Sequence, residues 1–308
     1  MTIKTLLAAT MAASLTLLTA CGADTADSGA VKAAENTDGG SGSPLMYRVT
    51  DPDSEVILFG TFHILPEGMD WKSDELEAAI ARAEEVWYEL PAGSENDPAA
   101  QQLSMQYGMS DVPLTSRLTS GQRRKLEKGL EEAGLPLAAF EPMQPWLAAV
   151  SIPLFQMMQA GYSPEQGAEM QLQQLTGDKG QRAFETIEQQ LRFFADMPEE
   201  RQIDYLMQSV EDAGENLAMT DRLAKAWAEG DYDFIETRMI AEMKSETPEL
   251  YDVLLVQRNR DWVQQLDAEL KGAGVDFVAV GAGHLVGPDG VPELLEDLGY
   301  DVELIGAR

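Results

Sequence analysis

Cysteine, histidine and basic residues are all scarce in this chain of 308 residues. It contains one cysteine and two histidines, and 22 Lys and Arg stand against 53 Asp and Glu, for a formal net charge of −31. A single cysteine excludes an internal disulfide and a metal site built from several thiolates. The charge argues against nucleic acid as a partner and against direct electrostatic binding to anionic lipid. An acidic surface favours solubility and attracts cations.

The N-terminus has the features of an export signal. Lys4 supplies a positive start and Leu6 to Leu18 an apolar core that is short for a membrane-spanning helix. The end of this segment, LTAC, resembles the lipobox of bacterial lipoproteins, in which cleavage precedes a lipidated cysteine. We therefore expect a signal peptide over residues 1–20 and a lipid anchor on Cys21. The alternative is an ordinary export signal with a chance cysteine.

This lipobox predicts a place in the bacterial cell envelope, with the membrane contacted only through the lipid. Gly22, and not aspartate, follows the cysteine, which favours the outer over the inner membrane. Residues 21–44 lack large apolar side chains apart from one valine and are rich in Gly, Ser, Asp and Ala. Such a composition predicts a flexible tether, so the folded domain is expected over residues 45–308.

Strand patterns lie at both ends of this domain and helical patterns lie between them. The predicted strands cover 46–50, 56–62 and 86–90 near the N-terminus, and 276–285 and 301–305 near the C-terminus. A helix that begins after Ser73 connects 56–62 to 86–90, so these two strands are expected to be parallel neighbours. The sequence therefore predicts an α/β fold: a mixed sheet built from the terminal strands, with a large, mainly helical middle section.

Both histidines follow apolar strands in the same pattern, Gly-x-x-His. His63 ends VILFGTFH and His284 ends VAVGAGH. Sites in open α/β sheets form at the carboxyl ends of the strands, and glycine lets the backbone turn or approach a ligand closely. We expect the two imidazoles to meet at one metal ion. The alternative is that each histidine is an unrelated polar residue at a strand end.

Two imidazoles need carboxylates to complete a ligand set. Glu89, in YELP, follows the predicted strand 86–90 and is the first candidate, both as a ligand and as a proton acceptor. Glu185, in FETIE, is placed similarly. A mixed imidazole and carboxylate set is typical of Mn, Co or Zn. Arg258 and Asn259 interrupt an apolar helix, where they could stabilise an oxyanion or hold a substrate carboxylate, although spacing alone favours a solvated helix face.

These residues resemble the TraB/GumN family, to which the Tiki metalloproteases are related. The resemblance runs through LFGTFHILPEGMDW, VWYELP, FETIEQQLRFFADMPEERQIDYL, LLVQRNRDWVQQL and DFVAVGAGHLVGPDGVPELLEDLGYDVE. It implies that His63 and His284 bind a metal, and that Glu89, Glu185 and the pair Arg258–Asn259 occupy the family's polar positions. One departure is Glu169, which stands where aspartate is common.

The resulting hypothesis is a lipid-anchored, metal-dependent hydrolase that acts on a peptide or small-molecule substrate. Its catalytic candidates are Glu89, Glu185, Arg258 and Asn259, and its metal candidates are His63, His284 and Glu89. A second hypothesis is an envelope lipoprotein that binds or sequesters a peptide, a metal or a metal-bearing cofactor without turnover. A third is a structural lipoprotein in which the histidines have no shared role.

Overall fold

The computed structural model describes residues 43–211 and 213–305. The expected signal peptide, the lipidated Cys21 and nearly all of the expected tether therefore lie outside the described residues. In the described part of the chain, no helix combines the length and the apolar character needed to cross a membrane.

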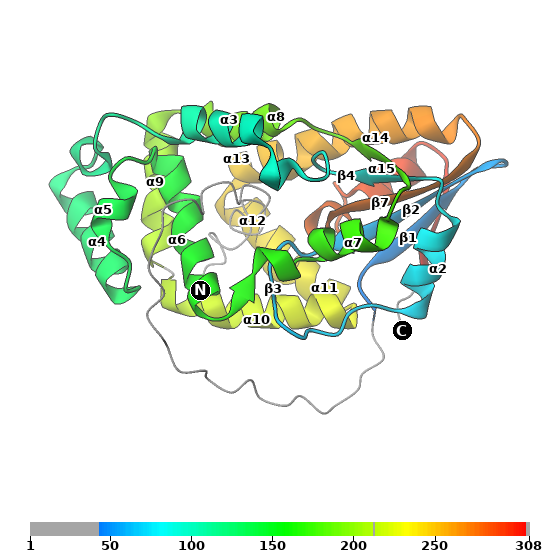
Figure 1. Cartoon of the computed structure of the whole chain (residues 1–308), viewed down its shortest axis with the longest axis horizontal. Helices are drawn as coiled ribbons and strands as arrows, with labels where there is room; N and C mark the ends of the chain where they lie inside the picture. The colour runs from blue at the N-terminus through cyan, green and yellow to red at the C-terminus, as the bar shows by residue number, and fades with distance from the viewer. Residues whose placement is uncertain (1–42, 212, 306–308) are drawn as a thin grey trace.

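The strands of the terminal segments and one strand of the middle section, β6, form one mixed sheet of six strands, and helices make up most of the chain between the terminal segments, as the α/β prediction required (Figure 1). The spatial order is β6-β4-β7-β2-β1-β8, in which β6, β4, β7 and β2 are parallel. The strands are β1 (Met46–Thr50), β2 (Ser54–Thr61), β4 (Glu85–Tyr88), β6 (Gly180–Ala183), β7 (Gly274–Gly281) and β8 (Asp301–Ile305). A second, small sheet pairs β3 (Leu65–Pro66) with β5 (Tyr162–Ser163).

One prediction about this sheet was wrong. The strands β2 and β4 are parallel but not neighbours, because β7 from the C-terminal end of the domain lies between them. The reason is burial. Residues Phe277 to Val280 of β7 alternate between the two apolar faces of the sheet and are all buried, which is typical of a central strand. Glu89 is consequently placed beside the strand that leads to His284 and not directly beside the strand that leads to His63.

Helices cover both faces of the sheet. On one face, α14 (Gln257–Leu270) and α15 (Val291–Asp297) pack on a smaller apolar cluster that includes Leu58, Trp87 and Trp262. The other face joins the larger core formed with the helical middle section. The helix α2 (Asp74–Arg82) begins where expected, since the side chain of Ser73 accepts a hydrogen bond from the Leu76 N–H.

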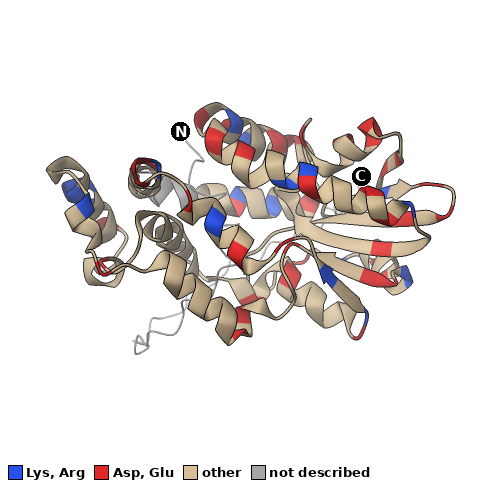
Figure 2. Ribbon diagram, turned by 90° about the horizontal axis from the view of Figure 1, so that it is seen from above, with Lys and Arg blue, Asp and Glu red and all other residues tan. Residues whose placement is uncertain are grey.

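The middle section is almost entirely helical, and acidic residues are spread over it and over the sheet end of the molecule (Figure 2). Its α-helices are α3 (Pro98–Gly108), α4 (Ser120–Glu132), α5 (Leu137–Phe140), α6 (Pro145–Gln159), α7 (Ala168–Thr176), α8 (Ile187–Ala195), α9 (Glu199–Glu211), α10 (Ala213–Glu229), α11 (Tyr232–Ile235), α12 (Ala241–Glu246) and α13 (Pro248–Tyr251). Short 3₁₀ turns are η2 (Ser94–Asn96), η3 (Leu114–Arg117), η4 (Pro164–Gln166) and η7 (Ala282–His284).

A wider turn precedes the helix that carries Arg258 and Asn259. Between α13 and α14 the chain forms a π-helical segment, η6 (Asp252–Val256). A second π-helical segment, η5 (Glu236–Ile240), lies between α11 and α12. Single π-helical turns often mark functional sites. The segment η6 ends two residues before Arg258, the most completely bonded polar residue of the site described next.

Candidate active site at the carboxyl ends of the parallel strands

Four parallel strands each deliver one site residue just beyond their carboxyl ends. Glu185 follows β6, Glu89 follows β4, His284 follows β7 and His63 follows β2. The two glutamates are held side by side because the Glu185 N–H donates to the Glu89 carbonyl at 3.0 Å, which extends the pairing of their strands. This is the edge at which open α/β sheets bind ligands.

The start of α14 brings Arg258 and Asn259 to the same place. All six predicted side chains (His63, Glu89, Glu185, Arg258, Asn259 and His284) are buried, with at most 8% of any residue exposed. Buried charged groups of this kind are rare unless they are paired. The interpretation of Arg258 as part of a solvated helix face is therefore wrong, because its guanidinium lies inside the protein.

Arg258 holds both glutamates. Its Nη2 donates to Glu89 Oε2 at 2.6 Å and to Glu185 Oε2 at 2.9 Å, and its Nε donates to Glu185 Oε1 at 2.7 Å. Its Nη1 contacts the Leu254 carbonyl and His284 Nε2, both at 3.1 Å. These five contacts use the five N–H groups of a guanidinium. Arg258 thus has a complete set of partners within the protein.

The two glutamates differ in what remains open to a ligand. Both oxygens of Glu185 accept further bonds, Oε1 from Trp262 Nε1 at 2.9 Å and Oε2 from Gln190 Nε2 at 3.0 Å. Glu89 Oε1 accepts only from the Gly281 N–H, at 2.8 Å, among the hydrogen bonds of the described residues. That oxygen lies 3.8 Å from His284 Nε2. Glu89 therefore keeps accepting capacity toward the histidines, and Glu185 does not.

The protonation pattern of His284 follows from its partners. Asn259 Nδ2 donates to the Asp289 carbonyl at 2.7 Å, so the amide oxygen of Asn259 faces His284 Nδ1, 2.5 Å away. Nδ1 must then carry the hydrogen, and Nε2 is the acceptor that faces Arg258. Burial, followed by the charge of Arg258, holds the pKa of His284 well below its ordinary value. A neutral imidazole with a fixed Nδ1–H is the form that binds metals through Nε2, although here Arg258 occupies that nitrogen.

His63 is oriented by a carboxylate from another element. Glu169, in the first turn of α7, places Oε1 2.5 Å from His63 Nδ1 and also accepts from the Thr61 hydroxyl. Burial alone would lower the pKa of His63, but the charge and hydrogen bond of Glu169 raise it above its ordinary value. Nδ1 is thus the donor, and Nε2 is left for a ligand.

Gly281 marks the point where these groups meet. A β-carbon added there would lie 3.2 Å from Glu89 Oε1, 3.3 Å from His63 Nε2 and 3.7 Å from the ring of His284. Burial alone would raise the pKa of Glu89, but Arg258 and the two histidines hold it well below its ordinary range. The site therefore presents an ionised carboxylate oxygen, the Nε2 of His63 and the ring edge of His284 around one glycine.

These three groups do not by themselves complete a tight ion-binding cluster. Among the described residues, the only three acidic or histidine side chains whose ligand atoms all lie within 4.8 Å of one another are Glu85, Glu269 and Asp276, on β4, α14 and β7. This acidic cluster could hold a metal ion. Arg182 already pairs with it, with Nη1 3.2 Å from Glu85 Oε2 and 2.6 Å from Glu269 Oε2.

The acidic cluster predicts a pH effect on stability. Burial and the charges of Glu269 and Glu85 raise the pKa of Asp276 from 3.8 to about 6. Since the folded protein then holds this proton more tightly than the unfolded chain, the folded state is destabilised as the pH rises from about 4 through about 6. Asp276→Asn should remove that loss. We expect it to raise the free energy of unfolding at pH 7.5 by roughly 1 kcal/mol, allowing for solvent screening.

Urea denaturation at pH 4, 6 and 7.5 checks this prediction. Asp297→Asn, at an exposed position on α15, removes the same charge as a matched control. The prediction would be contradicted if Asp276→Asn raised the free energy of unfolding at pH 7.5 no more than the control does. A loss of stability that appears only with added Mn²⁺ or Ca²⁺ would instead identify Asp276 as a ligand of an ion.

The histidine site communicates with two small hollows. One, of about 110 Å³, is lined by His63, Glu89 and Glu169 together with residues of the η2 loop and of η4 and α7. The other, of about 30 Å³, is lined by His63, His284 and apolar residues that include Ile235 and Met239. The first hollow therefore gives a carboxylate-lined approach to His63, whereas the second is an apolar enclosure.

Sequence reasoning missed several side chains of this site. Glu169 was noted only as a departure from the family pattern, and Thr61, Gln190 and Trp262 were not singled out. All four make hydrogen bonds to His63, Glu89 or Glu185, or to a partner of theirs. The sequence gives little indication that Glu169 belongs to the site. Glu169 lies in the first turn of a helix that follows a glycine, where a carboxylate is ordinary.

The fold and the site define an α/β protein with a buried His, Glu and Arg centre at the carboxyl ends of its parallel strands. The TraB/PrgY/gumN family model matches residues 45–304, so the chain belongs to this family. The match spans nearly all of the described residues and every predicted polar residue of the site. Neither the curated proteins nor the solved structures gave a match.

Proposed function

We propose that this chain is a metal-dependent hydrolase of peptide bonds or related amides, held at the outer membrane of a bacterial envelope by a lipid on Cys21. The observation that carries the hydrolase proposal is the convergence of His63 Nε2, His284 and Glu89 Oε1 around Gly281. The lipobox supports the anchor, and the export signal supports the location.

The donor chemistry suits a divalent ion of the Mn, Co or Zn kind. Two imidazole nitrogens, each with its other nitrogen bonded to a fixed oxygen, and one carboxylate oxygen form a mixed set of this type. His63, His284 and Glu89 would hold the ion, which supplies a water of lowered pKa when bound. Because Arg258 Nη1 contacts His284 Nε2, binding of an ion competes with that contact.

The other residues of the site position these three. Glu169 fixes the ring of His63, Asn259 fixes the tautomer of His284, and Arg258 keeps Glu89 ionised and in place. Of the two glutamates proposed as proton acceptors, Glu89 is the better placed. Its Oε1 faces the histidines, whereas both oxygens of Glu185 are already bonded twice.

A second candidate function is a site that binds a peptide or a metal without turning it over. The observation that favours it is the complete bonding of Arg258, whose five N–H groups all have partners in the protein. An oxyanion needs donors that are free to approach it. If Arg258 keeps its partners, a developing negative charge on a substrate would have to be stabilised by another group.

The test combines metal analysis with a cleavage assay. Wild type and His63→Ala/His284→Ala should be compared by elemental analysis and on a peptide library with added Mn²⁺, Co²⁺ or Zn²⁺. We expect bound metal and cleavage in the wild type, and loss of both in the double variant. Metal without cleavage would support the binding function. Cleavage that survives in the double variant would exclude the proposed site.

A further inference from the structure

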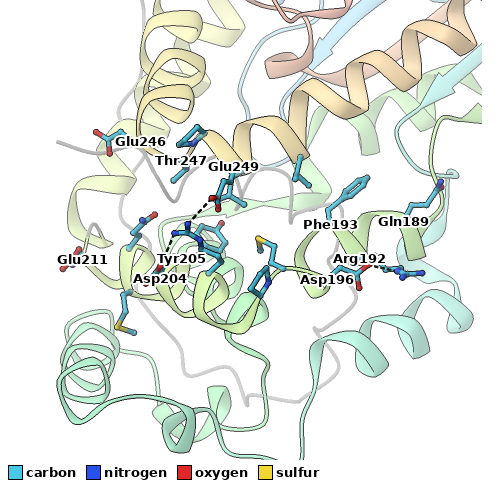
Figure 3. Close-up of a pocket in the computed structure, with 18 residues that line it drawn as sticks. Gln189, Arg192, Phe193, Asp196, Asp204, Tyr205, Glu211, Glu246, Thr247 and Glu249 are labelled. Atoms are coloured by element: carbon cyan, nitrogen blue, oxygen red, sulfur yellow. Dashed lines mark hydrogen bonds and ion pairs between the residues drawn. The ribbon is translucent and has the colours of Figure 1, made fainter.

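A large cavity lies outside the histidine site. It has a volume of about 950 Å³ and lies between α8–α9 on one side and the segment from α12 to η6 on the other (Figure 3). We call it the helical groove. Its volume is at the upper end of the range of about 300–1,000 Å³ that is usual for ligand pockets, and it far exceeds the 110 Å³ beside His63.

The walls of the helical groove are apolar and its rim is acidic. Phe193, Met197, Met207, Leu250 and Val253 contribute apolar surface. The charged lining residues are five carboxylates and two guanidiniums, which leaves a net charge of −3. The carboxylates are Asp196, Asp204, Glu211, Glu246 and Glu249, and the guanidiniums are Arg192 and Arg201. An apolar wall with an acidic rim disfavours anionic ligands such as nucleotides, fatty acids or acidic lipids.

The acidic groups are distributed along the whole groove. Figure 3 shows Glu211 and Glu246 at one end, Asp204 and Glu249 in the middle, and Asp196 toward the end that holds Phe193. One arginine serves both middle carboxylates, since Arg201 lies 3.6 Å from Asp204 Oδ2 and 3.1 Å from Glu249 Oε1. Asp196 pairs with Arg192 and Glu211 pairs with Lys125, so the excess negative charge lies mainly at the two middle acids that share one cation. That excess favours a cationic partner.

Two residues of the groove wall carry polar atoms without a partner. Among the described residues, the buried Tyr205 hydroxyl and the buried Gln208 Oε1 make no hydrogen bond, and Tyr205 is only 2% exposed. Buried polar groups are nearly always bonded, so these two atoms of α9 are exceptions in the wall of the groove.

We propose that the helical groove binds a cationic amphipathic peptide segment. Its apolar side chains enter the groove, and its Lys and Arg side chains face the carboxylates of the rim. This proposal concerns a surface separate from the histidine site and does not depend on hydrolysis, because binding can be measured without turnover. The two sites are nonetheless adjacent, since the ring of Phe193 lies 5.5 Å from Arg258 Cζ.

The test uses three fluorescein-labelled peptides and fluorescence anisotropy. The first peptide contains Leu and Lys, the second replaces Lys by Glu, and the third replaces Leu by Ser. We expect the Leu–Lys peptide to bind at least tenfold more tightly than either of the others, and to weaken as salt is added. Equal binding of the Leu–Lys and Ser–Lys peptides would overturn the proposal, because attraction by net charge alone would explain it.

Charge-reversal variants locate the binding. Asp204→Lys/Glu249→Lys changes two exposed rim residues and should lower the affinity for the Leu–Lys peptide at least tenfold. The matched control is Glu296→Lys/Asp297→Lys, which makes the same charge change at exposed positions of α15, outside the groove. We expect it to change affinity less than threefold. An equal loss of affinity in both variants would show that the peptide binds the acidic surface in general, and would contradict the assignment of binding to the groove. Circular dichroism verifies that both variants fold.

Discussion

Arg258→Met is expected to lower the free energy of unfolding by about 3–5 kcal/mol at pH 7.5. The guanidinium is the only cation in contact with both Glu89 and Glu185 among the ion pairs of the described residues, and all three side chains are buried. Removing one partner of a buried ion pair leaves charges that are neither solvated nor neutralised. Two glutamates share this one cation, so the loss should fall in the upper part of that range.

The pH dependence of this variant has a definite sign. In the wild type the pKa of Glu89 is held below its ordinary value of 4.5, so its contribution to stability is present above that pH and is lost as the pH falls below it. Without Arg258, burial is no longer opposed by that charge and raises the pKa of Glu89. The variant should therefore gain more stability than the wild type as the pH is lowered from 7.5 toward 5, because the gain from Asp276 is common to both proteins.

Urea denaturation at pH 5 and 7.5 measures both effects. Arg123→Met removes an exposed arginine from an i,i+4 pair with Glu127 and should have little effect. The triple variant Arg258→Met/Glu89→Gln/Glu185→Gln removes the buried charges together and should recover at least half of the loss. An Arg258→Met protein as stable as the Arg123→Met control would show that these groups are not charged partners in solution.

The edge of the sheet that carries the site could be predicted from sequence, because local patterns define it. The apolar runs that end in Gly60 and Gly281 identify two strands, and a histidine follows each strand within a few residues. The carboxyl ends of parallel strands lie at one edge of a sheet, so the parallel arrangement alone predicts that the two histidines lie at the same edge. Glu89 and Glu185 were predicted by the same argument, and they follow β4 and β6.

The order of the strands could not be predicted in this way. Pairing between β7 and its neighbours joins residues from opposite ends of the domain, and the apolar pattern of β2 fits several neighbours equally well. The burial of Arg258 was also outside the reach of sequence. It depends on which face of α14 lies on the sheet and on the π-helical turn at η6, and residue spacing encodes neither clearly. Glu169 reaches His63 only through the tertiary packing of α7.

The second large effect separates the two glutamates by function. Provided that a cleavable peptide is found, Glu89→Gln should lower turnover by roughly 10²–10⁴-fold, whereas Glu185→Gln should lower it less than about tenfold. The reason is geometric. Glu89 Oε1 lies at the Gly281 meeting point and 3.8 Å from His284 Nε2, and an amide there supplies neither the charge nor the basicity of a carboxylate. Glu185 acts on Arg258 and Trp262, away from that point.

The loss of stability should be at least as large in Glu185→Gln as in Glu89→Gln, although the loss of turnover is larger in Glu89→Gln. Glu185 accepts four N–H groups at its two oxygens, and the amide nitrogen of glutamine can accept none of them. We expect Glu185→Gln to lower the free energy of unfolding by about 2–3 kcal/mol, at least as much as Glu89→Gln. The crossed result, with turnover sensitive to Glu89 and stability sensitive to Glu185, cannot come from general damage to the fold. If turnover instead followed stability in both variants, neither carboxylate would have a direct part in the reaction, and the site around Gly281 would lose its proposed acid ligand and proton acceptor.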